Sequence, residues 1–212
     1  MAEESLRHVL SRCKSMMGLI TDRHNSVLRL LYDAIPVERF KKIDVDRLCQ
    51  QHLVMSGERQ RPDLVAEGID GKTIILDVTC PFVNGPTSLE IAAERKLTKY
   101  EGLATNIHDL TGDDVQIYPF VVGSLGCWSR FNEPAMKALG IPRGVRSRLK
   151  KQMVLAAISG SQKVWNCFID GCHKNEGGIV VERGRRRREE RSSGSGLAVP
   201  TQTLGGTCRT LL

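Results

Sequence analysis

The sequence predicts an α/β domain in which a mixed sheet of about four strands is flanked by helices. Three observations carry this prediction. Residues 61–79 have the pattern of a β-hairpin, residues 87–104 have the pattern of a helix with one apolar stripe, and residues 115–122 form an apolar run of the length of a strand. The 212 residues are enough to bury one hydrophobic core.

The hairpin is the centre of this fold. Pro62 suits the first position of a strand, and residues 64–66 lead into a turn rich in Gly and Asp. Residues 73–79 are apolar and β-branched, as is typical of a mostly buried strand. Asp70-Gly71 between the two apolar runs is a strong hairpin signal, because glycine tolerates the left-handed conformation that such loops need.

The length of the hairpin loop decides which residues face each other. A three-residue loop at 69–71 pairs Gly68 with Lys72, and counting outward then pairs Asp63 with Asp77. A two-residue turn shifts the register by one and places the two acids on opposite faces. In the first register their Cβ atoms lie roughly 4.5–5.5 Å apart, where like charges are destabilising unless a positive group lies between them. A divalent cation meets this need, because hard cations bind carboxylate oxygens.

A capping-box pattern at 87–90 predicts the start of the next helix, which is expected to run to about Ala104. Lys96 falls inside the apolar stripe of this helix, and Lys99 lies at its edge. A lysine on a buried face needs a charged partner or a route to solvent. The two carboxylates of the hairpin are the expected partner. Glu90 closes the capping box, and a place near the acid pair is the alternative role for it.

The spacing of the two acids, with thirteen residues between them, resembles the signature of PD-(D/E)xK nucleases. The segments RPDLV, IILDVTCPF, ERKLTKY and VVGSLGCW, within roughly residues 60–165, are similar to the restriction-like endonuclease domain of site-specific non-LTR retrotransposon polyproteins. The resemblance implies a restriction-endonuclease-like core and a Mg²⁺- or Mn²⁺-dependent enzyme that nicks double-stranded target DNA. The nick would expose a 3′-hydroxyl for target-primed reverse transcription. Reverse transcriptase and element RNA are the implied partners in the full polyprotein.

The resemblance also implies roles in the reaction. Asp63 and Asp77 would hold the metal. Lys96, or Lys99 as the second choice, would orient a water molecule or stabilise the pentavalent phosphate. In the wider superfamily the lysine usually lies two residues after the second acid. That position here is Thr79, so the resemblance implies a lysine that has moved onto the following helix.

Further residues are expected to support the lysine or contact DNA. Tyr100, in a K-x-x-x-Y pattern, is expected to support the lysine or contact a phosphate, with an ordinary core tyrosine as the alternative. Arg61, at the start of the hairpin, is a candidate phosphate contact. Arg23 and His24 belong to a triplet that the resemblance places on the helix before the nuclease core, where it contacts DNA or the site. The alternative is an exposed first turn of a helix predicted from Thr21 or Asp22 to about Ala34.

A second basic surface is predicted on a long helix at 143–168. Arg146 and Lys150 lie on its basic face, which can follow the backbone of a DNA duplex. The alternative is a face that is simply solvated. Residues 132–139 are expected to form a shorter helix that ends at Gly140, and residues 106–111 a loop before the strand at 115–122, which we expect at the centre of the sheet.

The amino end contains half of a zinc-knuckle pattern. His8 and Cys13 lie in a helix predicted at 2–17, and the resembled family completes the four ligands with a C-x-x-C pair upstream. We therefore interpret residues 1–19 as the remnant of a zinc knuckle in a chain truncated at its amino end. Two ligands do not make a closed tetrahedral site, so no zinc is expected in this fragment. The alternative is a solvent-side histidine and a helical cysteine.

Charge and composition restrict the partners and the compartment. A net charge of +7 favours nucleic acid or an acidic membrane surface as a partner. The seven cysteines do not form a secreted disulfide framework, which indicates a reducing compartment. The sequence has no signal peptide and no apolar run of ~18–20 residues, so we expect neither secretion nor membrane insertion. A nuclear protein, cytoplasmic before import, is the prediction.

Three segments are therefore predicted: the zinc-knuckle remnant at 1–19, the endonuclease domain at 20–170 and a basic, disordered tail at 171–212. The main alternative to the enzyme is a catalytically inactive nucleic-acid-binding remnant of a retrotransposon polyprotein. The missing cysteine pair and the tail favour the remnant, whereas the presence of both acids and the lysine favours the enzyme. A resolvase-like nuclease for branched DNA would use the same site chemistry.

Overall fold

The core of the molecule is a four-stranded sheet with the strand order β1-β2-β3-β4. The computed structural model describes residues 5–45, 60–171, 173–174 and 180–181. The strands of the sheet are β1 (Phe40–Val45), β2 (Leu64–Gly68), β3 (Lys72–Thr79) and β4 (Asp114–Val121). The first three pair antiparallel and β4 is parallel to β3, so the sheet is mixed. The predicted α/β class, with about four strands and flanking helices, is confirmed.

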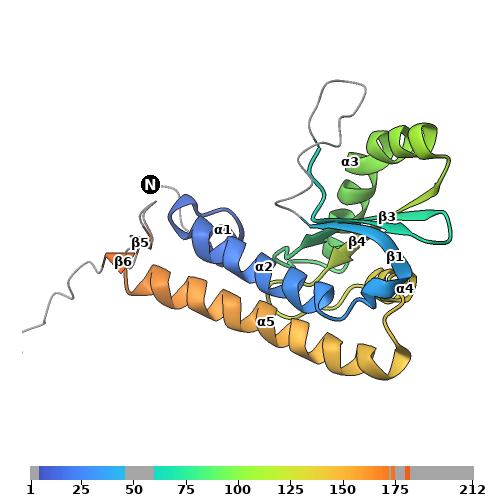
Figure 1. Ribbon diagram of the computed structural model, residues 1–212. Helices are drawn as coiled ribbons and strands as arrows, with labels where there is room; N and C mark the ends of the chain where they lie inside the picture. Colours follow the sequence, from blue (N-terminus) through green and yellow to red (C-terminus); the bar gives the residue numbers. More distant parts are fainter. Residues whose placement is uncertain (1–4, 46–59, 172, 175–179, 182–212) are drawn as a thin grey trace, which may run out of the picture.

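Helices cover both faces of this sheet (Figure 1). The α-helices are α1 (Leu6–Ser11), α2 (Met17–Tyr32), α3 (Ser88–Thr111), α4 (Asn132–Ala138) and α5 (Arg143–Ile169). The shorter elements are the 3-10 helices η1 (Lys14–Met16) and η2 (Val37–Arg39) and the two-stranded pair β5 (His173–Lys174) and β6 (Val180–Val181). Helices α2 and α5 run side by side on one face, and α3 lies on the other. None of the helices in the described part of the chain has the length and apolarity that a membrane crossing requires.

The hairpin has the predicted register. Leu64 pairs with Leu76 and Glu67 pairs with Thr73, and because β2 ends at Gly68 and β3 begins at Lys72, the loop has the three residues 69–71. Gly71 in that loop has a φ of 75°, the left-handed conformation that glycine tolerates. The ladder ends one residue short of the acids, and continuing the same register places them opposite each other.

Alternation along β3 decides which side chains meet which helices. Ile75 packs with Tyr100 and its neighbours on α3. Leu76 and Val78 point the other way, into the larger core that α2, α4 and α5 cover. Asp77 therefore points from a central strand toward α3, although its neighbours in the chain belong to an apolar core.

Three predicted helix boundaries are wrong. The helix predicted at 2–17 is broken after α1, so Cys13 lies between α1 and η1. Helix α2 begins at Met17, ahead of the predicted cap at Thr21 or Asp22. Helix α3 continues through the predicted loop at 106–111, because Leu103 and Ile107 extend its apolar stripe over the sheet.

Two further local predictions differ from the structure. The capping box does not form: the side chain of Thr87 makes no capping hydrogen bond, and the Ser88 hydroxyl interacts with Asn84 instead. The strand predicted at the centre of the sheet is β4, which lies at its edge. The predicted helix at 132–139 and the long one at 143–168 are confirmed as α4 and α5. The segment boundaries at 19 and 170 stay predictions, and most of the predicted tail lies outside the described residues.

Candidate active site

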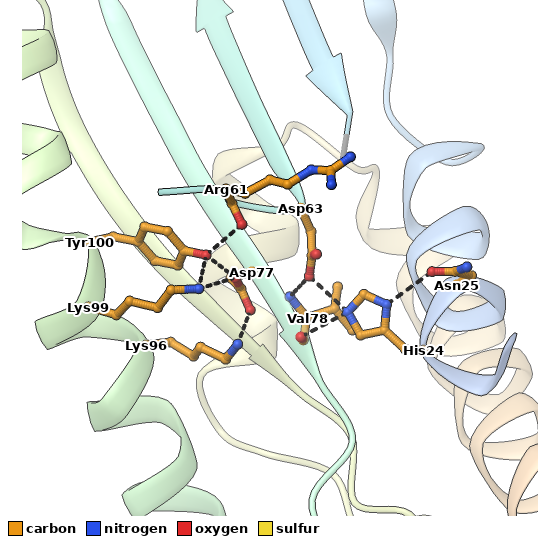
Figure 2. A network of polar contacts seen from close by, with 9 residues as sticks. All are labelled: His24, Asn25, Arg61, Asp63, Asp77, Val78, Lys96, Lys99 and Tyr100. Carbon is orange, nitrogen blue, oxygen red and sulfur yellow. Dashed lines mark hydrogen bonds and ion pairs between the residues drawn. The ribbon is translucent and has the colours of Figure 1, made fainter. Parts of the chain in front are cut away.

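Three side chains of α3 converge on Asp77 (Figure 2). The Asp77 side chain is 5% exposed, and its Oδ2 atom forms an ion pair with Lys96 Nζ. Its Oδ1 atom accepts a hydrogen bond from the Tyr100 hydroxyl and lies 3.9 Å from Lys99 Nζ. Lys96 and Tyr100 reach the same carboxylate because residues four apart share a helix face. Ala93, which is fully buried, lets that face approach the sheet.

Tyr100 connects this cluster to the start of the hairpin. Its ring is fully buried, and its hydroxyl oxygen lies 2.9 Å from the main-chain carbonyl oxygen of Arg61. Lys99 Nζ donates a hydrogen bond of 2.7 Å to the same hydroxyl. A phenol has one hydrogen to donate and can accept from a lysine at the same time. Tyr100 therefore fixes the position of Asp77 relative to the segment that carries Asp63.

Asp63 is held from the opposite side. Its Oδ2 atom accepts a hydrogen bond of 2.6 Å from the main-chain N–H of Val78 and lies 2.9 Å from His24 Nε2. His24 belongs to α2, on the other face of the sheet from α3. The acid pair is therefore contacted by basic side chains from both helical layers, as Figure 2 shows.

His24 is a cation in this environment. Its Nε2 atom faces Asp63 Oδ2 and, at 3.1 Å, the Val78 carbonyl oxygen, while Nδ1 lies 3.2 Å from Asn25 Oδ1. Both ring nitrogens thus face acceptors, which suits an imidazolium that carries two N–H donors. Burial disfavours the charged form, but the hydrogen bond and negative charge of Asp63 outweigh it and raise the pKa of His24 to about 9.

The two carboxylates repel one another. Burial and the negative charge of Asp63 raise the pKa of Asp77, and Lys96 and Tyr100 partly oppose that rise. This is the behaviour expected of facing carboxylates that are buried, where only added positive charge keeps both of them ionised. In the described residues Lys96, Lys99 and His24 supply that charge.

The donor set fits a Mg²⁺ or Mn²⁺ ion. Asp63 Oδ1 accepts no hydrogen bond from the residues that the structure describes, and Lys96 is 25% exposed at the side chain, so it can move off Asp77. No group of three or more His, Cys, Asp or Glu side chains in the described ranges is arranged to hold a metal. Mg²⁺ is commonly bound by one or two carboxylates together with water and substrate phosphate oxygens. Two neighbouring carboxylates meet that description, whereas a closed structural site needs more ligands.

Arg23 is not a DNA contact. The residue is 2% exposed, and its guanidinium donates hydrogen bonds to Ser161 Oγ at 2.7 Å and to the Leu10 carbonyl at 2.9 Å. A longer bond of 3.4 Å reaches the Cys80 carbonyl. The prediction failed because α2 packs against α5 along the side that carries Arg23. Burial lowers the pKa of this guanidinium, which joins four segments of the chain from inside.

The other predicted DNA contacts have intramolecular partners or face solvent. Arg146 Nε donates to the Ile141 carbonyl at 2.8 Å, and Lys150 Nζ lies 5.3 Å from the ring centre of Trp128. The Arg61 side chain is exposed and points away from the acid pair in Figure 2. Their contacts with DNA stay predictions.

The remaining predicted positions show no site of their own. His8 is exposed, whereas Cys13 is buried with its sulfur 3.0 Å from Ser15 Oγ, so the half zinc knuckle is not presented as a ligand pair. Thr79 ends β3 and is half-buried. Glu90 lies in the first turn of α3 and does not belong to the cluster around Asp77.

Sequence reasoning left open what the structure assigns to His24, and it missed the main chain of Val78. The resemblance allowed His24 to contact either DNA or the site, and the structure places it on Asp63. No local pattern predicts this contact, because 39 positions separate the two residues. The sequence could not predict the hydrogen bond from the Val78 N–H, because that bond depends on where the hairpin ladder ends.

No model of a protein family matches this chain, and no curated protein matches it significantly. A solved structure described as "Structure and function of phenuiviridae cap snatching endonucleases" is similar over 71% of this chain and 64% of its own, with 15% identity and a TM-score of 0.41. The chain thus spans less than two thirds of the length of that structure.

Proposed function

We propose that this protein is a metal-dependent endonuclease that hydrolyses phosphodiester bonds in DNA. The observation that carries the proposal is that Asp63 lies beside Asp77, which in turn pairs with Lys96 (Figure 2). The two acids come from the two arms of the hairpin, and the lysine comes from the helix that follows it. Facing carboxylates with an adjacent, partly exposed ammonium group suit a reaction in which negative charge builds up on a phosphate.

The residues divide the chemical work. Asp63 and Asp77 would hold Mg²⁺ or Mn²⁺ through their carboxylate oxygens. A bound ion supplies positive charge against the reacting phosphate and lowers the pKa of a coordinated water. Lys96, once it leaves Asp77, can donate hydrogen bonds to a water molecule or to a phosphate oxygen.

Neighbouring side chains keep the two acids in place. Tyr100 holds Asp77 by its hydroxyl, and Lys99 holds Tyr100. His24 and the Val78 N–H hold one oxygen of Asp63 and leave the other for a ligand. Partners that orient metal ligands in this way typically contribute about 10- to 100-fold to the metal affinity or the activity of a site.

The biological setting is the finer part of the proposal. The segments RPDLV, IILDVTCPF and ERKLTKY support a role in nicking target DNA for insertion of a non-LTR retrotransposon. A nuclear location, and reverse transcriptase and element RNA as partners, belong to the same proposal. The high positive charge of the chain suits a nucleic-acid substrate.

Nicking of supercoiled plasmid with Mg²⁺ or Mn²⁺ tests the reaction. The native chain is expected to nick, and both Asp77→Asn and Lys96→Ala are expected to lose that activity. Lys41→Ala, which removes an exposed lysine of β1, is the matched control and should retain it. Activity that survives in Asp77→Asn would assign the cleavage to another site. DNA binding by the native chain without nicking would instead favour a catalytically inactive, nucleic-acid-binding remnant.

A further inference from the structure

A pocket of about 210 Å³ lies between α1, the segment after β3 and the first two turns of α3. Three arginines line it: Arg7 and Arg12 from the amino-terminal end and Arg95 from α3. No Asp or Glu is among the described residues that line it. The pocket is thus strongly positive. Its lining residues come from segments that are far apart in the sequence.

The three guanidinium groups are available to a ligand. All three arginines are exposed, and none forms an ion pair with a carboxylate in the part of the chain that the structure describes. A guanidinium offers several N–H donors in a planar fork that matches phosphate oxygens. Three of them around one small pocket favour an anion with several oxygens over a single carboxylate.

Polar groups at the base of the pocket point to the same ligand. Ser11 Oγ is buried and has no hydrogen-bond partner in the structure, and its residue lines the pocket. Asn84 and Ser88 add an amide and a hydroxyl at the start of α3. The Thr87 side chain does not cap this helix, so the positive end of its dipole also faces the region.

The pocket lies close to the acid pair along α3. Ser88 and Arg95 lie on the pocket side of this helix, and Lys96 directly follows Arg95. At a rise of 1.5 Å per residue, Ser88, at the far end of the pocket, lies roughly 12 Å from Lys96 along the axis, so the pocket is at most about that far from the lysine along α3. Because successive phosphates of one strand of a duplex advance about 3.4 Å along its axis, this upper limit corresponds to about three to four nucleotides.

We propose that the Arg7–Arg12–Arg95 pocket binds a backbone phosphate of the cleaved DNA strand, within about four nucleotides of the scissile one. The inference rests on the proposed endonuclease function and adds to it a substrate-positioning site. The pocket holds the strand in place relative to Lys96 and the acids. It takes no part in breaking the bond.

Equilibrium binding of a fluorescent DNA duplex in EDTA, at a series of salt concentrations, tests the pocket without any cleavage. Arg12→Gln and Arg95→Gln are each expected to lower the slope of log K against log salt by about one. The loss of one phosphate contact weakens binding by about eightfold at 0.1 M salt. Arg29→Gln, on an exposed face of α2, removes the same charge and should leave the slope unchanged. Equal slopes for the native chain and both pocket variants would overturn the proposal.

Neutral-phosphate substitution locates the contact on the substrate. We expect the native chain to nick slowly those oligonucleotides whose single methylphosphonate replaces the scissile phosphate or one further phosphate within about four nucleotides of it. In Arg12→Gln the further position should lose its sensitivity, because an arginine that contacts that phosphate is gone, whereas the scissile position should keep it. The same sensitivity in Arg12→Gln as in the native chain would contradict the proposal.

The two experiments separate failure of the pocket from failure of the endonuclease. Altered salt slopes without any nicking would retain a phosphate pocket but reject its place beside a cleavage site. Metal-dependent nicking with unaltered slopes would retain the endonuclease and reject the pocket. Circular dichroism shows whether the variants fold, which is expected because the three arginines are exposed.

Discussion

The two helical layers each bring a basic side chain to the sheet, and the two have opposite surroundings. Arg23 of α2 is buried, and the oxygens to which it donates in the described part of the chain are neutral, those of Ser161 and of main-chain carbonyls. Lys96 of α3 is a quarter exposed and pairs with Asp77. A guanidinium that donates to neutral groups from several segments holds those segments together. An ammonium beside two repelling carboxylates can be exchanged for another cation, and that property is what a metal-dependent site requires.

Burial acts on different charges at the two places. Around Arg23, burial lowers the pKa of the guanidinium, and hydrogen bonds replace the lost hydration. Around Lys96, burial and the charge of Asp63 raise the pKa of Asp77, so the ionised carboxylates are the groups that this environment disfavours. We therefore expect substitutions on the α3 side to affect activity and substitutions on the α2 side to affect stability.

The largest effect is expected on the α3 side. Lys96→Met should reduce the nicking rate by at least about 100-fold, since it removes a donor aimed at the developing charge. The free energy of unfolding should change little, because the lysine is partly exposed and its loss leaves Asp77 with Tyr100. Single-turnover nicking and urea unfolding measure the two quantities. A variant that unfolds readily but nicks normally would reverse the assignment.

The counterpart on the α2 side is Arg23→Met. It should lower the free energy of unfolding by about 2–4 kcal/mol, because it leaves the Ser161 hydroxyl and a buried carbonyl without their donor. The nicking rate per folded molecule should stay near that of the native chain. Urea unfolding gives the first quantity, and nicking normalised to the folded fraction gives the second. Native stability in this variant would show that the buried guanidinium does not hold these segments together.

Tyr100→Phe tests a smaller effect within the α3 cluster. Removing the hydroxyl frees one oxygen of Asp77 and releases Lys99, and should reduce nicking about 10- to 100-fold. The buried ring stays, so the fold should be preserved. Tyr118→Phe is the matched control, since that hydroxyl donates to Gln116 at 2.6 Å on β4, away from the acid pair. Equal nicking by the two variants would remove Tyr100 from the site.

A pair of glycines on α5 gives the smallest expected effect. A Cβ on Gly160 would lie 2.6 Å from Arg23 Cγ and 3.2 Å from its Cα, so Gly160→Ala should destabilise the fold by about 1–3 kcal/mol. Nothing lies within 4 Å of a Cβ on Gly144, and Gly144→Ala should stabilise by up to about 1 kcal/mol through helix propensity. Thermal unfolding measures both. The same sign for the two variants would contradict the close packing of α2 on α5.

The local sequence was sufficient to predict the hairpin and one half of the site. Asp70-Gly71 predicts a hairpin whose loop has either two or three residues, and the three-residue loop found in the structure sets the register that brings Asp63 and Asp77 together. The helical period then places Lys96 and Tyr100 on the face that meets the sheet. These steps involve neighbours within one supersecondary unit, where periodicity is informative.

The other half depends on contacts between distant segments. Arg23 and His24 are adjacent in the sequence, and nothing in their local pattern predicts that one is buried against Ser161 while the other reaches Asp63. The arginine pocket likewise joins α1 to α3 across more than 80 positions. Such contacts follow from how helices pack, which one amphipathic pattern does not determine.

Titration with Mn²⁺ is the most direct test of the claim that Asp63 and Asp77 form one metal site. Binding can be followed by electron paramagnetic resonance for the native chain and for Asp63→Asn and Asp77→Asn, with Asp109→Asn on the outside of α3 as the matched control. We predict that the native chain and the control bind Mn²⁺ and that each variant of the pair loses the same site. Undiminished binding in both variants, or no binding by the native chain up to millimolar Mn²⁺, would contradict the account.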